Sequence, residues 1–158
     1  QLAALRLGWE WVDADVEIEL QAAKSIAAIF ADAGEQSFRN LETAMLGEQV
    51  QRDRCVVALG GGVVLQEENR RLLQEAAKSG RGRIVWLKAS PEALWQRIQA
   101  DPTTAARRPN LTAAGGVKEV RRLLREREGW YQQCADLSID TENKSTIEVA
   151  EEIVARMK

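Results

Sequence analysis

The chain has 158 residues, of which 45% are hydrophobic and 29% are charged, and its formal net charge is −2. This length and balance fit one globular domain with its own core, and the charge gives no electrostatic reason to expect nucleic acid as a partner. Histidine is absent, which excludes histidine bases, Ser-His-Asp triads and histidine-containing metal sites. Any catalysis must therefore use carboxylates, arginine or lysine and backbone dipoles, with or without a bound hard cation.

The cysteines and apolar runs indicate a compartment. No apolar run is long enough to cross a bilayer, and no signal-peptide pattern opens the sequence. Cys55 and Cys134 are too few for a disulfide framework or a structural zinc site. We therefore expect a cytoplasmic protein without a membrane partner.

Strands and helices are expected to alternate along the chain. In order, the pattern predicts a helix over 1–8, a strand over 9–14, helices over 16–30 and 35–50, a strand over 55–62, a helix over 69–79, a strand over 83–89, a helix opening at Ser90, a helix over 117–135, a strand over 137–141 and a helix over 145–158. This alternation implies parallel pairing and an α/β three-layer sandwich with helices on both faces of the sheet.

Three consecutive glycines, Gly60, Gly61 and Gly62, end the apolar run CVVAL. Glycines after a buried strand let backbone N–H groups approach a ligand that any Cβ would keep away. In open α/β sheets, ligands bind beyond the carboxyl ends of the strands. Glycine runs also form plain turns, so the triplet alone is a weak indication of a small-molecule site. The motifs on either side of it strengthen this interpretation.

Two of these motifs carry acids. Asp13 and Asp15 lie two residues apart at a strand end, so in extended geometry they point the same way. They either serve a hydrated cation and a substrate hydroxyl or form a solvated acidic turn. Arg39 and Glu42 share one helix face. They are either an exposed pair worth about 0.3 kcal/mol or a guanidinium held for a carboxylate ligand.

Arginines form the remaining motifs. Arg107 and Arg108 precede Pro109 within residues 101–116, a small, polar stretch that is long for a helix–helix turn. They are either solvated charges or cations on a mobile loop that closes over transferring phosphates. Arg127 lies just before the Gly-Trp-Tyr at which its helix approaches the sheet.

In order, VDADVEIE, SIAAIFADAGEQSFRNLE, ALGGG, RRP and EREGWYQQCAD resemble the shikimate kinase family over essentially the whole chain. The resemblance implies a single P-loop kinase domain over 1–158 with a five-stranded parallel sheet. It implies a substrate-binding segment over about 13–50 and a mobile lid over about 101–116. It further implies a cytoplasmic monomer that transfers the γ-phosphoryl of ATP to the 3-hydroxyl of shikimate with Mg²⁺, toward chorismate and the aromatic amino acids.

The resemblance also implies roles for individual residues on the substrate side. Arg39 clamps the shikimate carboxylate and is oriented by Glu42, and Arg127 is the second carboxylate-binding arginine. Asp15 binds shikimate hydroxyls and accepts the proton. Gly60, Gly61 and Gly62 line the substrate pocket through their backbone groups.

On the nucleotide side, the resemblance implies three further roles. Asp13 lies near the water shell of Mg²⁺, Arg108 is the lid arginine that reaches the phosphates, and Arg97 lies on the adenine side. Two departures concern the lid and the glycines: RPNL replaces the usual RPLL, and Leu59 stands where many members have a small hydroxyl residue.

The largest departure is that the sequence contains no G-x-x-x-x-G-K-[ST] motif, which in the family precedes the helix matched by residues 1–8. We therefore expect an upstream segment with this P-loop and with the central first strand, whose absence would separate its neighbours by about 10 Å. The alternatives are another small-molecule kinase of this fold, such as one for gluconate, or a non-catalytic shikimate-binding module that lacks the P-loop.

Overall fold

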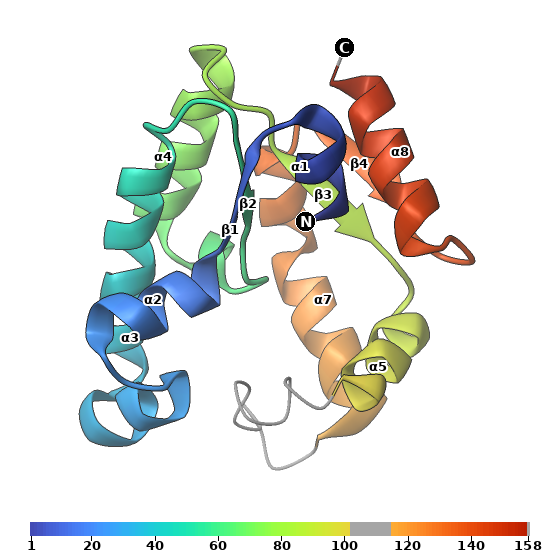
Figure 1. Cartoon of the computed structure of the whole chain (residues 1–158). Helices are drawn as coiled ribbons and strands as arrows, with labels where there is room; N and C mark the ends of the chain where they lie inside the picture. Colours follow the sequence, from blue (N-terminus) through green and yellow to red (C-terminus); the bar gives the residue numbers. More distant parts are fainter. Residues whose placement is uncertain (102–114, 158) are drawn as a thin grey trace.

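The computed structural model describes residues 1–101 and 115–157, which form short parallel strands surrounded by helices (Figure 1). In chain order the elements are α1 (Leu2–Leu7), β1 (Glu10–Asp13), α2 (Ala14–Ala22), α3 (Ile26–Gln49), β2 (Cys55–Ala58), the 3-10 turn η1 (Val63–Leu65), α4 (Glu67–Lys78), β3 (Val85–Lys88), α5 (Pro91–Ala100), α7 (Gly116–Cys134), β4 (Leu137–Asp140) and α8 (Thr146–Arg156). The expected elements are present in the expected order, and η1 is an addition.

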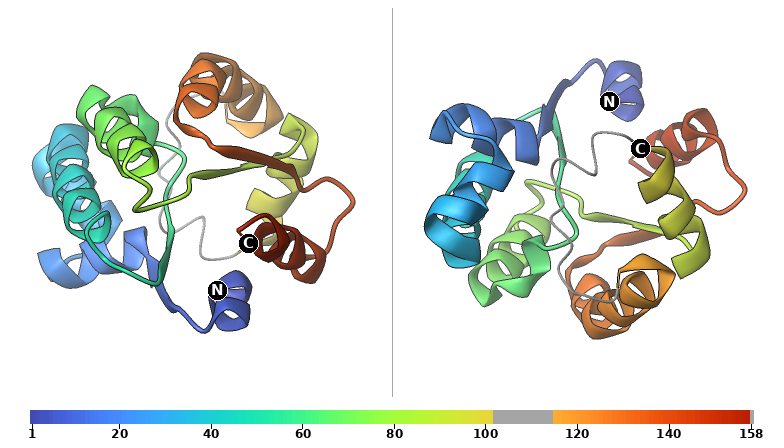
Figure 2. Two further views of the ribbon diagram at one scale, coloured as in Figure 1. Left: turned by 90° about the horizontal axis from the view of Figure 1, so that it is seen from above. Right: turned by 90° about the horizontal axis from the view of Figure 1, so that it is seen from below.

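The strands pair in parallel, as expected. Strand β1 pairs with β2, with Glu10 opposite Cys55, and β3 pairs with β4, with Val85 opposite Leu137. Among the described residues these are two separate two-stranded sheets. Figure 2 shows α7 on one side of β3 and β4 and α8 on the other. The α/β layering with helices on both faces is thus confirmed, and the upstream strand stays a prediction.

Local signals begin and end the helices. Ser90 accepts a hydrogen bond from the backbone N–H of Ala93 at 3.3 Å, and Pro91 is the first residue of α5, where its missing N–H costs nothing. Helix α8 opens with a capping box between Ser145 and Glu148. Helix α1 ends at Gly8, whose φ of 66° is left-handed. These caps set where the three helices begin or end.

Helix α3 is kinked at Gly34, which has φ 77° and ψ 175°. This backbone conformation is essentially confined to glycine. The kink turns the second part of the helix so that Phe38 and Met45 meet Ile18 of α2 and Ile29 of the first part in one buried cluster. Gly34, where the sequence predicts the end of a helical segment, is thus a kink within α3, and the helix predicted over 16–30 is divided between α2 and the first part of α3.

A second buried cluster anchors the turn that follows the glycines. Leu46 of α3, Val63 and Val64 of η1, Leu73 of α4 and Cys134 of α7 pack together. Because Met45 and Leu46 enter different clusters, α3 is held between the two cores. The helix and the turn after Gly62 consequently have fixed positions relative to each other.

Cys55 and Cys134 are free thiols, and burial raises the pKa of both, which makes the reactive thiolate scarcer. Within residues 1–101 and 115–157, no helix combines the length and the apolar character that crossing a membrane requires.

Substituting Gly34 with alanine should lower the free energy of unfolding by about 1 to 3 kcal/mol, because a Cβ strains this backbone conformation. Chemical denaturation measures the change. Gly47→Ala is the matched control, because Gly47 lies in the regular part of α3 with open space around its Cβ position. The control should leave stability unchanged or raise it by up to about 1 kcal/mol. Equal effects of the two substitutions would show that the kink is not strained.

Candidate functional site

The candidate site forms where β2 ends and the three glycines begin. The backbone turns there, with the N–H of Val63 bound to the carbonyl of Gly60 at 3.1 Å. Two side chains of α4 bind the backbone of the turn. Asn69 Nδ2 donates to the Val63 carbonyl at 3.0 Å, and Arg70 Nη1 donates to the Val64 carbonyl at 2.6 Å. The glycine peptides are therefore held in place at the carboxyl end of a strand.

Arg39 packs directly against Gly62. A Cβ on Gly62 would lie 2.5 Å from Arg39 Nη1 and 3.0 Å from Cζ, closer than packed atoms tolerate. Since Gly62 has an ordinary φ of −85°, its glycine identity is required by this contact and not by the backbone. At the preceding residue, a Cβ on Gly61 would lie 3.0 Å from the hydroxyl of Tyr131.

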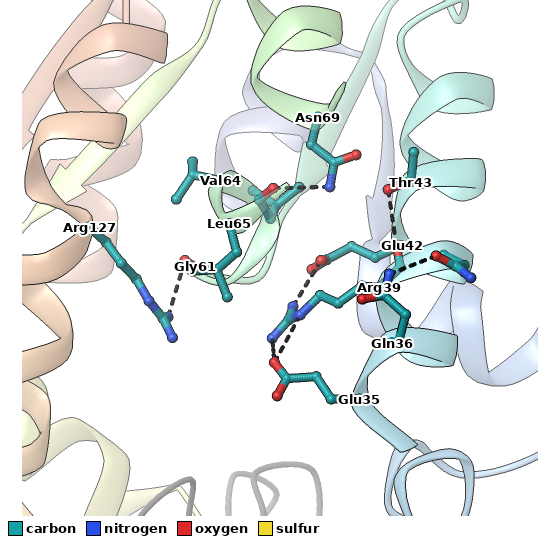
Figure 3. A network of polar contacts seen from close by, with 12 residues as sticks. Glu35, Gln36, Arg39, Glu42, Thr43, Gly61, Val64, Leu65, Asn69 and Arg127 are labelled. Carbon is teal, nitrogen blue, oxygen red and sulfur yellow. Dashed lines mark hydrogen bonds and ion pairs between the residues drawn. The ribbon is translucent and has the colours of Figure 1, made fainter. Parts of the chain in front are cut away.

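The Arg39 guanidinium is paired with two carboxylates of its own helix (Figure 3). Nη1 donates to Glu42 Oε2 at 2.9 Å, while Nε and Nη2 donate to Glu35 Oε1 at 3.3 and 3.1 Å. The side chains of Arg39 and Glu42 are only 8% and 4% exposed. The interpretation as an exposed surface pair is therefore wrong, because the second half of α3 turns both residues inward.

Burial raises the pKa of the Glu42 carboxyl, and the negative charge of Asp15 adds to this rise. The hydrogen bond and the charge of Arg39 act in the opposite direction without cancelling the effect of burial. Glu42 thus carries a carboxylate that is costly to keep charged, which is unusual for a residue that serves only structure.

The two aspartates do not share an extended strand. Helix α2 begins immediately after Asp13, whose Oδ1 accepts the backbone N–H groups of Asp15 at 3.0 Å and Val16 at 3.2 Å. The extended geometry expected for the two acids is wrong, because Asp13 is a helix N-cap and Asp15 lies in the first helical turn. Asp15 Oδ1 lies 3.6 Å from the Cβ position of Gly60, so it faces the glycine segment.

Helix α7 contributes two side chains from the opposite side. Tyr131 Oη donates to the Gly61 carbonyl at 2.6 Å, and Arg127 Nη1 donates to the same carbonyl at 3.4 Å. Arg127 Nε is buried without a hydrogen-bond partner among the described residues. Figure 3 shows Arg127 and Arg39 approaching the glycine segment from opposite sides.

Arg97 belongs to a different part of the molecule. Its Nη1 and Nη2 donate to the side-chain hydroxyl and the carbonyl of Thr141, both at 2.8 Å. The hydroxyl of Thr141 in turn donates to the carbonyl of Lys88 at 2.8 Å. Beside this network lies a cavity of about 430 Å³ lined by Ser90, Arg97 and Glu142, among others.

The structure thus brings together the residues that the sequence singles out for the substrate side: Asp15, Arg39, Glu42, Gly60, Gly61, Gly62 and Arg127. Arg108 and most of the 101–116 segment lie outside the described residues. Sequence analysis missed Glu35 and Tyr131. Each lies four residues from a singled-out arginine, Arg39 or Arg127, on the same helix face, and this spacing was the available signal.

A buried arginine, a second arginine and an aspartate thus surround the strand-end glycines of an α/β protein. A family model described as shikimate kinase matches residues 1–158. The shikimate kinase of Rhodopirellula baltica is 42% identical over 154 residues, covering 98% of this chain and 80% of the relative. That of Symbiobacterium thermophilum is 35% identical over 158 residues, covering 100% and 87%. The chain belongs to the shikimate kinase family.

A solved structure agrees with this assignment. The shikimate kinase of Acinetobacter baumannii in complex with shikimate superposes with a TM-score of 0.87 at 32% identity, over 99% of this chain and 82% of the other. The shikimate kinase of Aquifex aeolicus superposes with a TM-score of 0.74 at 26% identity, over 99% of this chain and 85% of the other. Fold and family therefore agree over nearly the whole chain.

Substituting Gly62 with alanine should lower the free energy of unfolding by about 1 to 3 kcal/mol, because the new methyl group displaces the Arg39 guanidinium from its buried pair. Gly60→Ala is the control, since its Cβ would meet Asp15 Oδ1 at an ordinary 3.6 Å. Denaturant titration of both variants measures the difference. A Gly62→Ala protein as stable as the Gly60→Ala protein would contradict the close contact.

The raised pKa of Glu42 predicts a pH dependence of stability. Folding raises the pKa above its ordinary value of 4.5, so the folded chain holds this proton more tightly than the unfolded chain. As pH rises from 4.5 through the raised pKa, the wild type should therefore lose stability relative to Glu42→Gln. Unfolding free energies of both proteins across this range measure the difference. If the stability of the wild type relative to Glu42→Gln instead rises over this pH range, the attraction of Arg39 for the Glu42 carboxylate outweighs the cost of burying its charge.

Proposed function

We propose that this protein is a shikimate kinase that transfers the γ-phosphoryl group of ATP to the 3-hydroxyl of shikimate. The products are ADP and shikimate 3-phosphate, a step toward chorismate and the aromatic amino acids. The single observation that carries the assignment of the substrate site is the buried Arg39–Glu42 pair against Gly62, in a chain of this family. Such a guanidinium, fixed before the ligand arrives, suits a carboxylate.

The carboxylate of shikimate binds between Arg39 and Arg127 in this proposal. Two contacts support the pairing: Arg39 is held by Glu42 at 2.9 Å, and Arg127 has a buried Nε without a partner among the described residues. An unsatisfied buried donor favours an acceptor brought by a ligand. Glu42 then acts as the residue that orients Arg39.

Asp15 binds the shikimate hydroxyls and accepts the proton of the attacking 3-hydroxyl. Its carboxylate lies beside the Gly60 backbone and close enough to Glu42 for its charge to raise the pKa of that residue. The peptide groups of Gly60, Gly61 and Gly62 line the pocket between Asp15 and the arginines. Phosphoryl transfer needs little more from the protein here than positioning of the hydroxyl and stabilisation of charge.

The nucleotide lies on the side of Arg97. The cavity of about 430 Å³ next to it is within the usual range for small-ligand pockets, and Thr141 fixes the guanidinium at the cavity wall. Arg108, in the proposed lid over 101–116, reaches the phosphates and stabilises the charge of the transition state.

Asp13 would hold Mg²⁺ through water in this proposal, and the bound ion would neutralise phosphate charge. Within the described residues, no group of three His, Cys, Asp or Glu side chains gathers to bind a metal. Asp13 fits a water-mediated role, because its backbone contacts use Oδ1 and an outer-shell carboxylate needs only one acceptor oxygen. Mg²⁺ commonly keeps several waters and is bound largely by substrate phosphates.

The family relationship favours this function over the two alternatives. The relatives at 35–42% identity are shikimate kinases and not gluconate kinases, and they are named as enzymes and not as binding modules. The two free cysteines suit the cytoplasm, and we propose that the protein acts there as a monomer.

Arg39→Lys tests the carboxylate site directly. Lysine keeps the charge but loses the planar fork, so shikimate affinity should fall by about 10- to 100-fold. Isothermal titration calorimetry with shikimate measures the change. Arg71→Lys is the control, because Arg71 forms only an exposed pair with Glu75 on α4, and its affinity should equal that of the wild type. Unchanged shikimate affinity in a folded Arg39→Lys protein would contradict the assignment of Arg39 to the carboxylate site.

A further inference from the structure

One edge of the Arg39 guanidinium is already filled by a carboxylate of the protein. Nη1 is bound to Glu42, whereas Nε and Nη2 both donate to a single oxygen of Glu35, at 3.3 and 3.1 Å. The Nε–Nη2 edge is one of the two edges on which a carboxylate can bind arginine with two parallel hydrogen bonds. Figure 3 shows Glu35 on that edge, at the side of Arg39 away from Glu42.

The two carboxylates differ in how firmly they are held. The Glu42 side chain is 4% exposed and the Glu35 side chain is 54% exposed. Glu35 also follows Gly34 directly, at the kink where the second part of α3 begins. Glu35 can therefore turn into solvent by rotating its own side chain, whereas Glu42 cannot leave without opening the core.

Charge also disfavours a third carboxylate beside the other two. Glu35 and Glu42 both contact Arg39. Asp15 and Arg127 are close enough for their charges to influence Glu42, so three carboxylates already face two guanidinium groups. A substrate carboxylate arriving at Arg39 would meet like charges at short range, which is costly in a partly buried site. Departure of the exposed carboxylate relieves this repulsion.

We propose that Glu35 is a built-in competitor of the substrate carboxylate at Arg39. Glu35 occupies the Nε–Nη2 edge of the guanidinium before a substrate binds, and the substrate carboxylate displaces it into solvent. Glu35 thereby lowers the affinity for every carboxylate ligand that needs this edge of Arg39. This inference rests on the proposed role of Arg39 as the carboxylate clamp.

The opposite role for Glu35 is to orient Arg39 as a second support beside Glu42. The two roles predict opposite changes. If Glu35 competes, its neutralisation frees the guanidinium edge in every molecule, and the apparent affinity rises by the reciprocal of the fraction that was unblocked before. If Glu35 orients Arg39, neutralisation weakens binding.

The experiment is a shikimate titration of the full chain carrying Glu35→Gln. The dissociation constant should fall by about three- to tenfold. Glu48→Gln is the matched control, because it makes the same change on the same helix at a residue that contacts Gln21 instead, and its affinity should not change. Glu35→Ala should show the same gain, which excludes a specific effect of the new amide.

Two outcomes would overturn the proposal: equal affinity in wild type and Glu35→Gln, or weaker binding in Glu35→Gln. Arg39→Lys, measured in parallel, separates this failure from failure of the carboxylate site itself. If Arg39→Lys weakens binding and Glu35→Gln does not strengthen it, only the competitor role is wrong. If Arg39→Lys has no effect, the role of Arg39 as the carboxylate clamp is wrong as well.

Adding Glu35→Gln to Arg39→Lys should give a smaller gain in shikimate affinity than adding it to the wild type, as expected for two residues that act on one interaction.

Discussion

The contact between the Arg39 guanidinium and the Gly62 backbone is the constraint on which the site depends. It requires a residue without Cβ at position 62, a kink at Gly34 that turns the second part of α3 inward, and a turn after the glycines that does not move. The turn meets the last requirement because Val63 and Val64 enter the same buried cluster as Leu46 of α3. Helix and glycine segment are therefore positioned by one core.

This arrangement is poorly explained as a device for stability. A buried ion pair often stabilises a fold less than apolar residues of the same volume would, because desolvation of both charges offsets their attraction. The raised pKa of Glu42 is a sign of that cost. A costly buried charge directed at strand-end glycines is instead what a preorganised ligand site requires. The half-exposed Glu35 keeps the remaining edge of the guanidinium paired while no ligand is present.

Much of this could be predicted from the sequence, because its signals are local. The glycine run, the Ser90–Pro91 helix start and the break at Gly34 each act within a few residues, and the family motifs select Arg39 and Arg127 for one site. The orientation of Asp13 and Asp15 could not be predicted from strand periodicity, because Asp13 caps a helix that begins one residue later. The contacts of Tyr131 with Gly61 span 70 residues and depend on how α7 packs, which no local pattern specifies.

The most direct test of the account is a crystal structure of the protein with shikimate bound. The account predicts the carboxylate of shikimate between the guanidinium groups of Arg39 and Arg127, with a ring hydroxyl at the Asp15 carboxylate. Shikimate bound elsewhere, or in this pocket with its carboxylate away from Arg39, would contradict it.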